Sequence, residues 1–132
     1  MPLPAAKQGD RVIGVDIHII MVPAPPGPPV PTPLPHPFAG IINSGCSTNV
    51  KIMGAPAAIL GCKAQNTPPH IPTAPGPFQK PPTNQATVIT GSPTVFINNK
   101  PAVRTTDTAL TCNDPADLPM GKVIAVGTVF VA

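Results

Sequence analysis

Short runs of β-branched and aromatic residues alternate with polar residues along this chain and are interrupted by glycine, asparagine and proline. Such alternation is typical of half-buried β-strands, in which successive side chains face opposite sides of a sheet. No stretch sustains an apolar period of about 3.6 residues, so any helix is expected to be a single turn. The pattern predicts an all-β protein with strands at 11–20, 49–53, 87–90, 94–97 and 123–131.

A short motif that begins with proline and alanine occurs three times, at residues 4–10, 56–62 and 101–107. The second and third copies also agree upstream at a constant offset of 45 residues, since Ser47 matches Ser92. Each copy is therefore predicted to follow a short strand and a tight turn, and the threefold repeat is expected to decide the architecture. The repeat residues are Pro4, Ala5, Ala6, Pro56, Ala57, Ala58, Pro101, Ala102 and Val103.

The first copy has no strand before it, but residues 128–131 at the C-terminus closely repeat residues 94–97. If this last strand pairs beside residues 4–6, three equivalent hairpins close around one axis and both termini lie at the same end. Apolar residues at matching positions are then expected to meet at the axis, namely Val50, Ile52, Val95, Ile97, Val129 and Val131. The residues expected to point outward or under a proline loop are Lys51, Phe96 and Phe130.

Proline dominates the composition and changes the picture of the connections. The 132 residues, 42% of them apolar, fit one domain spanning 1–132, and 23 are proline. The prolines concentrate in two blocks, 23–37 and 68–82. Because proline fixes φ and lacks an amide donor, both blocks are predicted to be stiff polyproline II connections that brace the strands.

The charge distribution and the apolar stretches of the chain bear on its partners and on its place in the cell. The net charge of +3 is scattered, with no basic run and no aromatic residue among the cations, which argues against nucleic-acid binding. No apolar stretch approaches the roughly 20 residues of a membrane span, and residues 1–11 lack a signal-peptide core. We expect a protein made in the cytoplasm, without an effector extension because the chain ends just after the closing strand.

The positions of three side chains relative to the motif suggest a metal site. His18 and His70 each lie eight residues after the last residue of a motif copy, and Cys112 lies five after Asp107. Equivalent positions on three hairpins converge where a tapering body narrows, and His36 is placed to supply a fourth ligand. Three imidazoles and one thiolate suit tetrahedral Zn²⁺, and iron and copper are alternatives. A structural metal would also compensate for the small core near the point.

Two other interpretations of these residues remain. Each histidine could simply bond a loop partner while Cys112 packs as a small apolar residue, and Cys46 is a competing thiol ligand. The acidic residues next to the candidate ligands are expected to support them by hydrogen bonding; they are Asp16, Asp114 and Asp117. Three cysteines without a secretory signal are expected to stay reduced, with Cys62 a small buried residue.

The motif copies, read together with the strand 94–97 and the turn after it, resemble PAAR-repeat proteins over nearly the whole chain. The resemblance implies a cone of short β-hairpins with a zinc site near its point, and by position the family's three-His, one-Cys set falls on His18, His36, His70 and Cys112. It also implies that the broad base sits on the trimeric VgrG-type spike of a type VI secretion system or related contractile injection machine. The chain departs from the family pattern at Lys7, Ile59 and Cys62.

The implied role is mechanical. One tip would cap each spike trimer, would sharpen it for puncture of a target envelope, and would leave the cell when the machine fires. Strand ends on the broad face are expected to extend the β-structure of the spike. Alternatives from other classes are a zinc hydrolase, a proline-rich module that binds aromatic-lined domains, and an adaptor that recruits effector cargo. Four protein ligands would close the coordination sphere, and the chain has no Glu to act as a base, which argues against the hydrolase.

Overall fold

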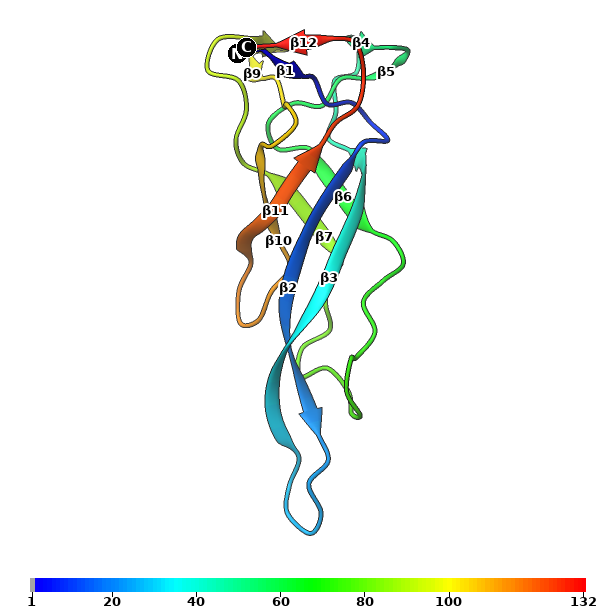
Figure 1. Ribbon diagram of the computed structural model, residues 1–132, viewed down its shortest axis with the longest axis vertical. Coiled ribbons are helices and arrows are strands. Elements are labelled where there is room, and N and C mark those ends of the chain that lie inside the picture. Colours follow the sequence, from blue (N-terminus) through cyan, green and yellow to red (C-terminus); the bar gives the residue numbers. More distant parts are fainter. Residues whose placement is uncertain (1) are drawn as a thin grey trace.

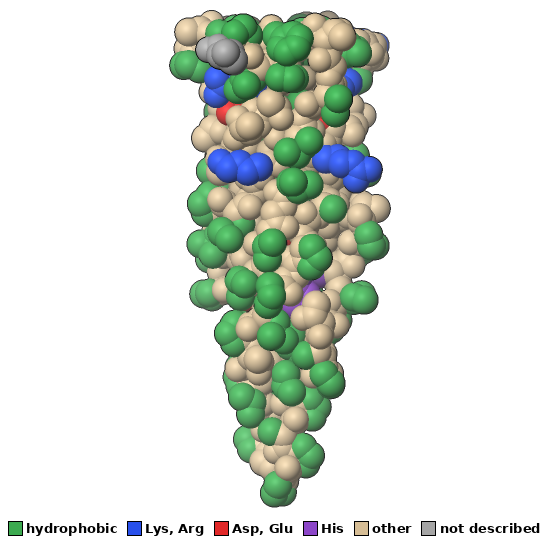
Figure 2. All heavy atoms as spheres, in the orientation of Figure 1, with side chains coloured by type: hydrophobic (Ala, Val, Ile, Leu, Met, Phe, Trp, Pro, Cys, Tyr) green, Lys and Arg blue, Asp and Glu red, His purple; other side chains and the backbone are tan. Residues whose placement is uncertain are grey.

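The protein is a tapering all-β body that narrows from a broad end to a point, as a computed structural model of residues 2–132 shows (Figures 1 and 2). The all-β cone expected from the sequence is confirmed. No helix in the described chain has the length and apolar character needed to cross a bilayer. The strands are β1 (Leu3–Pro4), β2 (Arg11–Val22), β3 (Val30–Ser44), β4 (Lys51–Ile52), β5 (Ala55–Pro56), β6 (Lys63–Asn66), β7 (Gln85–Val88), β8 (Phe96–Ile97), β9 (Lys100–Pro101), β10 (Thr108–Thr111), β11 (Leu118–Ile124) and β12 (Phe130–Val131).

Three two-stranded sheets form the broad end, which we call the base (Figure 1). They are β4–β5, β8–β9 and β1–β12. In the third sheet the two ends of the chain pair, with Leu3 opposite Val131, so the predicted closure of the first repeat by the C-terminal strand is confirmed. The other two hairpins turn through residues with positive φ, such as Gly54 at 85° and Asn99 at 65°, as tight β-turns require.

The three motif copies bond to one another in a closed ring. Ala6 N donates to Val103 O at 2.9 Å, Val103 N donates to Ala58 O at 3.1 Å, and Ala58 N donates to Ala6 O at 3.0 Å. A second ring follows two residues later, in which Gln8 N donates to Pro56 O, Leu60 N to Pro101 O and Thr105 N to Pro4 O. Equivalent atoms therefore make equivalent bonds in all three repeats, and this confirms the pseudo-threefold arrangement.

Apolar side chains from the three base sheets meet at the axis. This confirms the prediction for some of the residues named. Ile52 is buried together with the alanines of the motif, and Ile97 and Val131 pack against it. Val50 and Val129 are instead 37% and 38% exposed, so their predicted place at the axis is wrong. Each comes immediately before a two-residue strand of the base, β4 or β12. The outward residues are as predicted: Lys51, Phe96 and Phe130 are exposed.

Below the base, a closed barrel follows the order β10-β11-β2-β3-β6-β7. Each motif copy leads into a strand, namely β2, β6 or β10, and each of these strands pairs with the strand that follows it in sequence. The barrel strands β3, β6 and β10 were not among the predicted strands, and the predicted strand 123–131 is two strands. Its first part, in β11, completes the barrel, while β12 pairs with β1 in the base, so one continuous strand could not serve both sheets.

The first proline block is largely a strand, and the prediction of a polyproline II brace there is wrong. β3 pairs with β2 from Arg11 opposite Ile41 to Val22 opposite Val30, and this hairpin extends beyond the barrel to the point (Figure 1). Within β3 the prolines occupy every second position: Pro31, Pro33, Pro35 and Pro37. These prolines are tolerated because their nitrogens, which lack a hydrogen-bond donor, lie on the edge of β3 that faces away from β2.

The β2 residues opposite these prolines direct their amides away from β3. Ile17 N donates to Asn113 Oδ1 at 2.7 Å, and Ile19 N donates to Asp114 Oδ2 at 2.9 Å. Opposed residues in an antiparallel pair direct their amides either toward each other or both away. The proline nitrogens therefore lie on the outer edge of β3, where no bond to β2 is lost.

The second proline block contains no strand and connects β6 to β7, as predicted. It runs beside the free edge of β2, where Met21 N donates to Pro77 O at 2.9 Å and Gln79 N donates to Ile19 O at 2.8 Å. This connection thus covers the part of β2 that the barrel leaves unpaired.

Candidate metal centre

The β2–β3 hairpin presents a row of polar side chains to the interior, just below the barrel. Asp16 and His18 are two residues apart on β2 and therefore share one face of the strand. His36 lies directly opposite Asp16 on β3. All three side chains are almost completely buried, at 0–1% exposure. The period of two along each strand brings these groups to one place.

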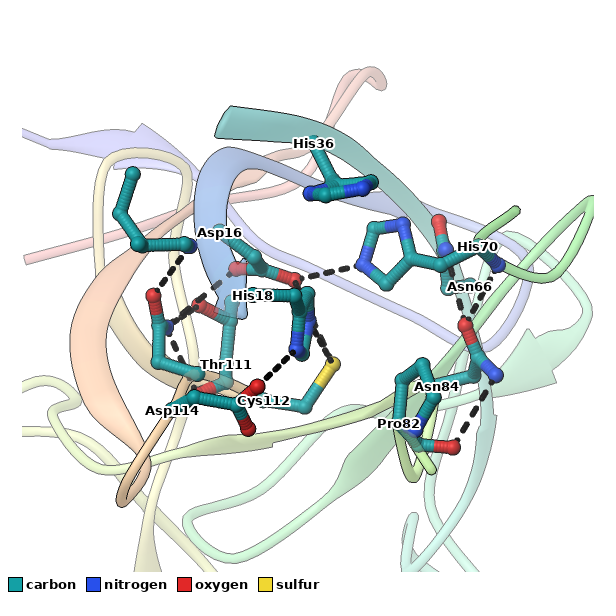
Figure 3. A network of polar contacts seen from close by, with 12 residues as sticks. Asp16, His18, His36, Asn66, His70, Pro82, Asn84, Thr111, Cys112 and Asp114 are labelled. Atoms are coloured by element: carbon teal, nitrogen blue, oxygen red, sulfur yellow. Dashed lines mark hydrogen bonds and ion pairs between the residues drawn. The ribbon is translucent and has the colours of Figure 1, made fainter. Parts of the chain in front are cut away.

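Two further residues enter from other parts of the chain. His70 lies in the second proline block, and its backbone amide is held by Asn84 Oδ1 at 2.8 Å. Cys112 comes immediately after β10. Ligand atoms of Asp16, His18, His70 and Cys112 all lie within 4.8 Å of one another (Figure 3). The structure thus brings together three of the four candidate ligands, with Asp16 beside them.

Asp16 is the central acceptor of this group. Its Oδ2 lies 2.8 Å from His70 Nε2 and 3.3 Å from the Cys112 thiol. The Cys112 sulfur is also 3.6 Å from His18 Nε2. Two imidazole nitrogens, a sulfur and a carboxylate oxygen therefore point at one small volume, which is a donor set suited to zinc.

His36, the fourth candidate, adjoins the group without being one of its four members. Its ring centroid is 5.5 Å from that of His18 and 5.6 Å from that of His70. Nδ1 lies 2.9 Å from Leu34 O, and donation to this carbonyl leaves the lone pair of Nε2 free to accept. Nε2 lies 3.4 Å from Thr73 Oγ1.

Burial favours the metal-binding protonation state of two histidines and opposes that of the cysteine. Desolvation lowers the pKa values of His18 and His36, which favours the neutral imidazoles that bind metals. Desolvation, together with the charge of Asp16, raises the pKa of Cys112 to about 12. Without a cation the thiol keeps its proton at neutral pH, so metal binding must release that proton.

Buried negative charge in this region lacks a basic partner. Asp16 and Asp114 are nearly inaccessible, and within residues 2–132 their only charge-pair contacts are to His18 and His70. His18 Nδ1 is 3.5 Å from Asp114 Oδ2, and it is the buried side-chain nitrogen without a hydrogen bond in the described chain. A dication held by the other nitrogen of His18 would compensate the carboxylates and would draw this contact closer, so the residues fit a metal ion.

The roles of several residues at this site were not foreseen from the sequence. Asp16 was expected to support a ligand by hydrogen bonding and not to be a member of the ligand group. Its position two residues before His18 indicates that both side chains lie on the same face of the strand. Asn113 Oδ1 accepts from the Ile17 amide and helps to position β2. Phe78 stacks near two histidine rings, with centroids 5.7 Å from His18 and 5.4 Å from His36. Cys46 lies elsewhere, against the buried cluster that includes Cys62.

A family profile for the PAAR motif matches residues 33–112, more than half of the chain. This chain belongs to the PAAR family. The resemblance stated from the motif copies is confirmed, and the protein is a PAAR-repeat protein of type VI secretion, with a general role at the spike tip. No curated protein matches the chain. In this PAAR protein the possible metal cluster lies where the barrel gives way to the projecting hairpin (Figures 1 and 3).

Proposed function

We propose that this PAAR protein is a structural tip that caps a trimeric VgrG-type spike, with one tip bound to each trimer. The observation that carries the proposal is the ring of three equivalent hairpins at the base. A single chain can sit coaxially on a three-chain spike only if it offers three similar surfaces, one to each subunit. The rings of backbone bonds through Ala6, Ala58 and Val103 supply this equivalence.

The base also exposes an apolar side chain on each of its three sheets. Met53 in the turn of the first hairpin is 56% exposed, Phe96 in β8 is 58% exposed, and Phe130 in β12 is 56% exposed. Large exposed apolar groups clustered at one end of a protein are typical of an interaction surface. One anchor per subunit of the spike is the arrangement that this proposal requires.

The opposite end suits contact with a membrane. The sequence from Ile17 to Val50, which includes the projecting hairpin, contains no Lys, Arg, Asp or Glu. On the face drawn in Figure 2, the visible lysines and arginines lie on the broad half of the molecule, while hydrophobic side chains continue to the point. Because charged groups are expensive to place in hydrocarbon, an uncharged point favours puncture of an envelope. The role is mechanical, with no catalytic step.

We propose further that one structural Zn²⁺ is held by His18, His36, His70 and Cys112. The His36 Nε2 lone pair and the convergence of the other three ligands support this set, and Asp16 would then accept a hydrogen bond within the site. The ion would link β2, β3 and the connections that carry His70 and Cys112. Such a link holds the narrow half of the cone in shape where there is little apolar core.

Binding to a purified VgrG-type trimer tests the capping role. Native mass spectrometry should detect one chain per trimer, and Phe96→Asp together with Phe130→Asp should weaken binding at least about tenfold, because charges would be buried at the interface. Ile13→Asp is the matched control, since Ile13 is 45% exposed on the barrel rather than on the base. Equal loss in the control, or a stoichiometry other than one per trimer, would refute the proposal.

Elemental analysis by mass spectrometry tests the metal site. The wild-type protein is expected to carry one zinc, and His70→Ala and Cys112→Ser are each expected to lose it. His36→Ala separates the proposed set from one in which Asp16 is the fourth ligand, because in the latter case zinc content would be retained. Cys46→Ser is the thiol control and should leave the zinc content unchanged.

A further inference from the structure

The second motif copy differs from the other two at the turn that leads into the barrel. In the first copy Asp10 pairs with Lys7 at 3.0 Å and accepts from the Lys7 amide at 3.0 Å. In the third copy Asp107 pairs with Arg104 at 3.0 Å and accepts from its amide at 2.6 Å. In the second copy the matching residues are Ile59 and Cys62. A charge pair has thus been replaced by an isoleucine and a thiol on the same backbone turn.

A second cysteine lies against this exceptional position. β3 ends at Ser44, which is paired with Lys63, so the next residue reaches the turn that carries Cys62. Gly45 has φ of 72° and lies so close that a Cβ there would be 3.0 Å from the Cys62 Cα. Cys46 follows and packs against the buried cluster that includes Cys62. The thiol pair therefore exists in the repeat that lacks the charge pair.

The two thiols differ in exposure and in acidity. Cys62 is completely buried, while Cys46 is partly exposed. Hydrogen bonding from Cys62 lowers the pKa of Cys46, and the same contact, together with burial, raises the pKa of Cys62. Cys46 is thus the more accessible and the more acidic of the two thiols, and Cys62 is the buried one.

We infer that Cys46 and Cys62 form a redox modification site, which closes to an intrachain disulfide when the protein meets a small-molecule disulfide such as oxidised glutathione. The Cys46 thiolate attacks one sulfur of the oxidant, which releases one glutathione thiolate and leaves a mixed disulfide. The Cys62 sulfur then attacks the Cys46 sulfur, loses its proton, and releases the second glutathione. The two protein thiols are oxidised by two electrons, and the oxidant is reduced to two thiols.

This disulfide would link two segments of the second repeat covalently. It would join the end of β3 to the motif turn in the position where the other two repeats are held by Lys7–Asp10 and Arg104–Asp107. The thiols are free in the structure, which corresponds to the reduced form. The inference depends neither on the proposed spike partner nor on the metal, because neither cysteine belongs to the metal cluster.

Peptide mapping of the full-length protein tests the inference, because each cysteine falls in a different tryptic peptide. Cleavage after Lys and Arg places Cys46 in 12–51, Cys62 in 52–63 and Cys112 in 105–122. After incubation of the native, metal-loaded protein with oxidised glutathione, we expect that a map recorded without reductant shows 12–51 linked to 52–63. The link should disappear on reduction and in Cys46→Ser.

Thermal unfolding supplies an independent readout. Closing the loop between the two cysteines should raise the Tm of the oxidised protein by about 5 °C or more over the reduced form. Cys62→Asp is the matched variant, because it introduces the aspartate of the other two copies and keeps a hydrogen-bond acceptor in the turn. The Tm of this variant should not respond to the oxidant. A stable glutathione adduct on Cys46, no oxidation at all, or a link to the peptide 105–122 would each overturn the inference.

Discussion

Thr106 adopts a backbone conformation that the other two repeats assign to glycine. Its φ is 73°, and the matching residues Gly9 and Gly61 have φ of 98° and 90°. All three amides donate to the barrel in the same way, for example Thr106 N to Val123 O at 2.8 Å. A β-branched residue in the left-handed region is strained, so the third repeat keeps the turn geometry in spite of its residue.

Thr106→Gly should therefore stabilise the protein. We expect a gain of about 0.5–1 kcal/mol in the free energy of unfolding, because relief of the left-handed strain exceeds the entropy that glycine adds to the unfolded chain. The threonine side chain is exposed, so its loss removes no packing. Urea unfolding measures the change. The reverse substitution, Gly9→Thr, meets no atom within 4 Å and should destabilise by about 1 kcal/mol; a gain there would contradict the explanation.

At the scale of an element, β3 shows how a proline-rich segment can be a strand. Its prolines lie opposite β2 residues whose amides point away from the pair, and the residues between them, such as Thr32 and Leu34, are free to bond β2. Over 30–38 the outer edge of β3 makes no strand pair within the described chain. Proline on that edge leaves no donors for another chain, which is a known way to prevent edge-to-edge association.

Two neighbouring substitutions in β3 should have opposite consequences. Thr32→Pro removes an amide that faces β2 opposite Ile20 and should destabilise the protein by about 1–3 kcal/mol, as judged by urea unfolding. Pro33→Thr adds an amide on the open edge and should leave stability nearly unchanged while promoting self-association, as measured by sedimentation velocity. If both variants lost stability equally, the assignment of the proline nitrogens to the outer edge would be incorrect.

At the scale of the whole molecule, two different devices hold the two ends of the cone. The base rests on rings of backbone hydrogen bonds and on the apolar cluster around Ile52. The narrow end has the β2–β3 hairpin, the second proline block beside it, and the polar cluster around Asp16. Stability is therefore expected to differ along the long axis, with the point depending on the proposed metal ion.

Hydrogen exchange with and without a strong chelator should reveal this division. On metal removal, amides of 16–22 and 70–79 should exchange at least about tenfold faster, because the link between β2 and the second proline block is lost. Amides of Ala6, Ala58 and Val103 in the base ring should keep their protection. Cys112→Ser provides the matched protein without a chelator. A uniform loss of protection along the chain would show that the metal holds the entire fold.

The threefold plan is encoded in the motif copies of the sequence. The second and third motif copies repeat the same short strand, turn and Pro-Ala segment. Equivalent segments need equivalent neighbours, so the similarity of 128–131 to 94–97 identified the strand that pairs with the first copy. The alignment of His18 and His70 relative to the motif predicted their convergence for the same reason. Even Asp16 was accessible to sequence reasoning, since residues two apart on a strand share a face.

The conformation of each proline block depends on its neighbours in the folded molecule. A segment such as 31–37 suits both a polyproline II connection and a strand whose missing donors face outward, and the presence of β2 beside it selects the strand. Within the described chain the second block meets β2 only at one isolated antiparallel bridge, Ile20 opposite Phe78, and it remains a connection. Likewise, the contact of Cys46 with Cys62 arises from the closure of β3 onto β6 and from the turn at Gly45. Pairing between segments is a property of the assembled barrel, and local sequence does not encode it.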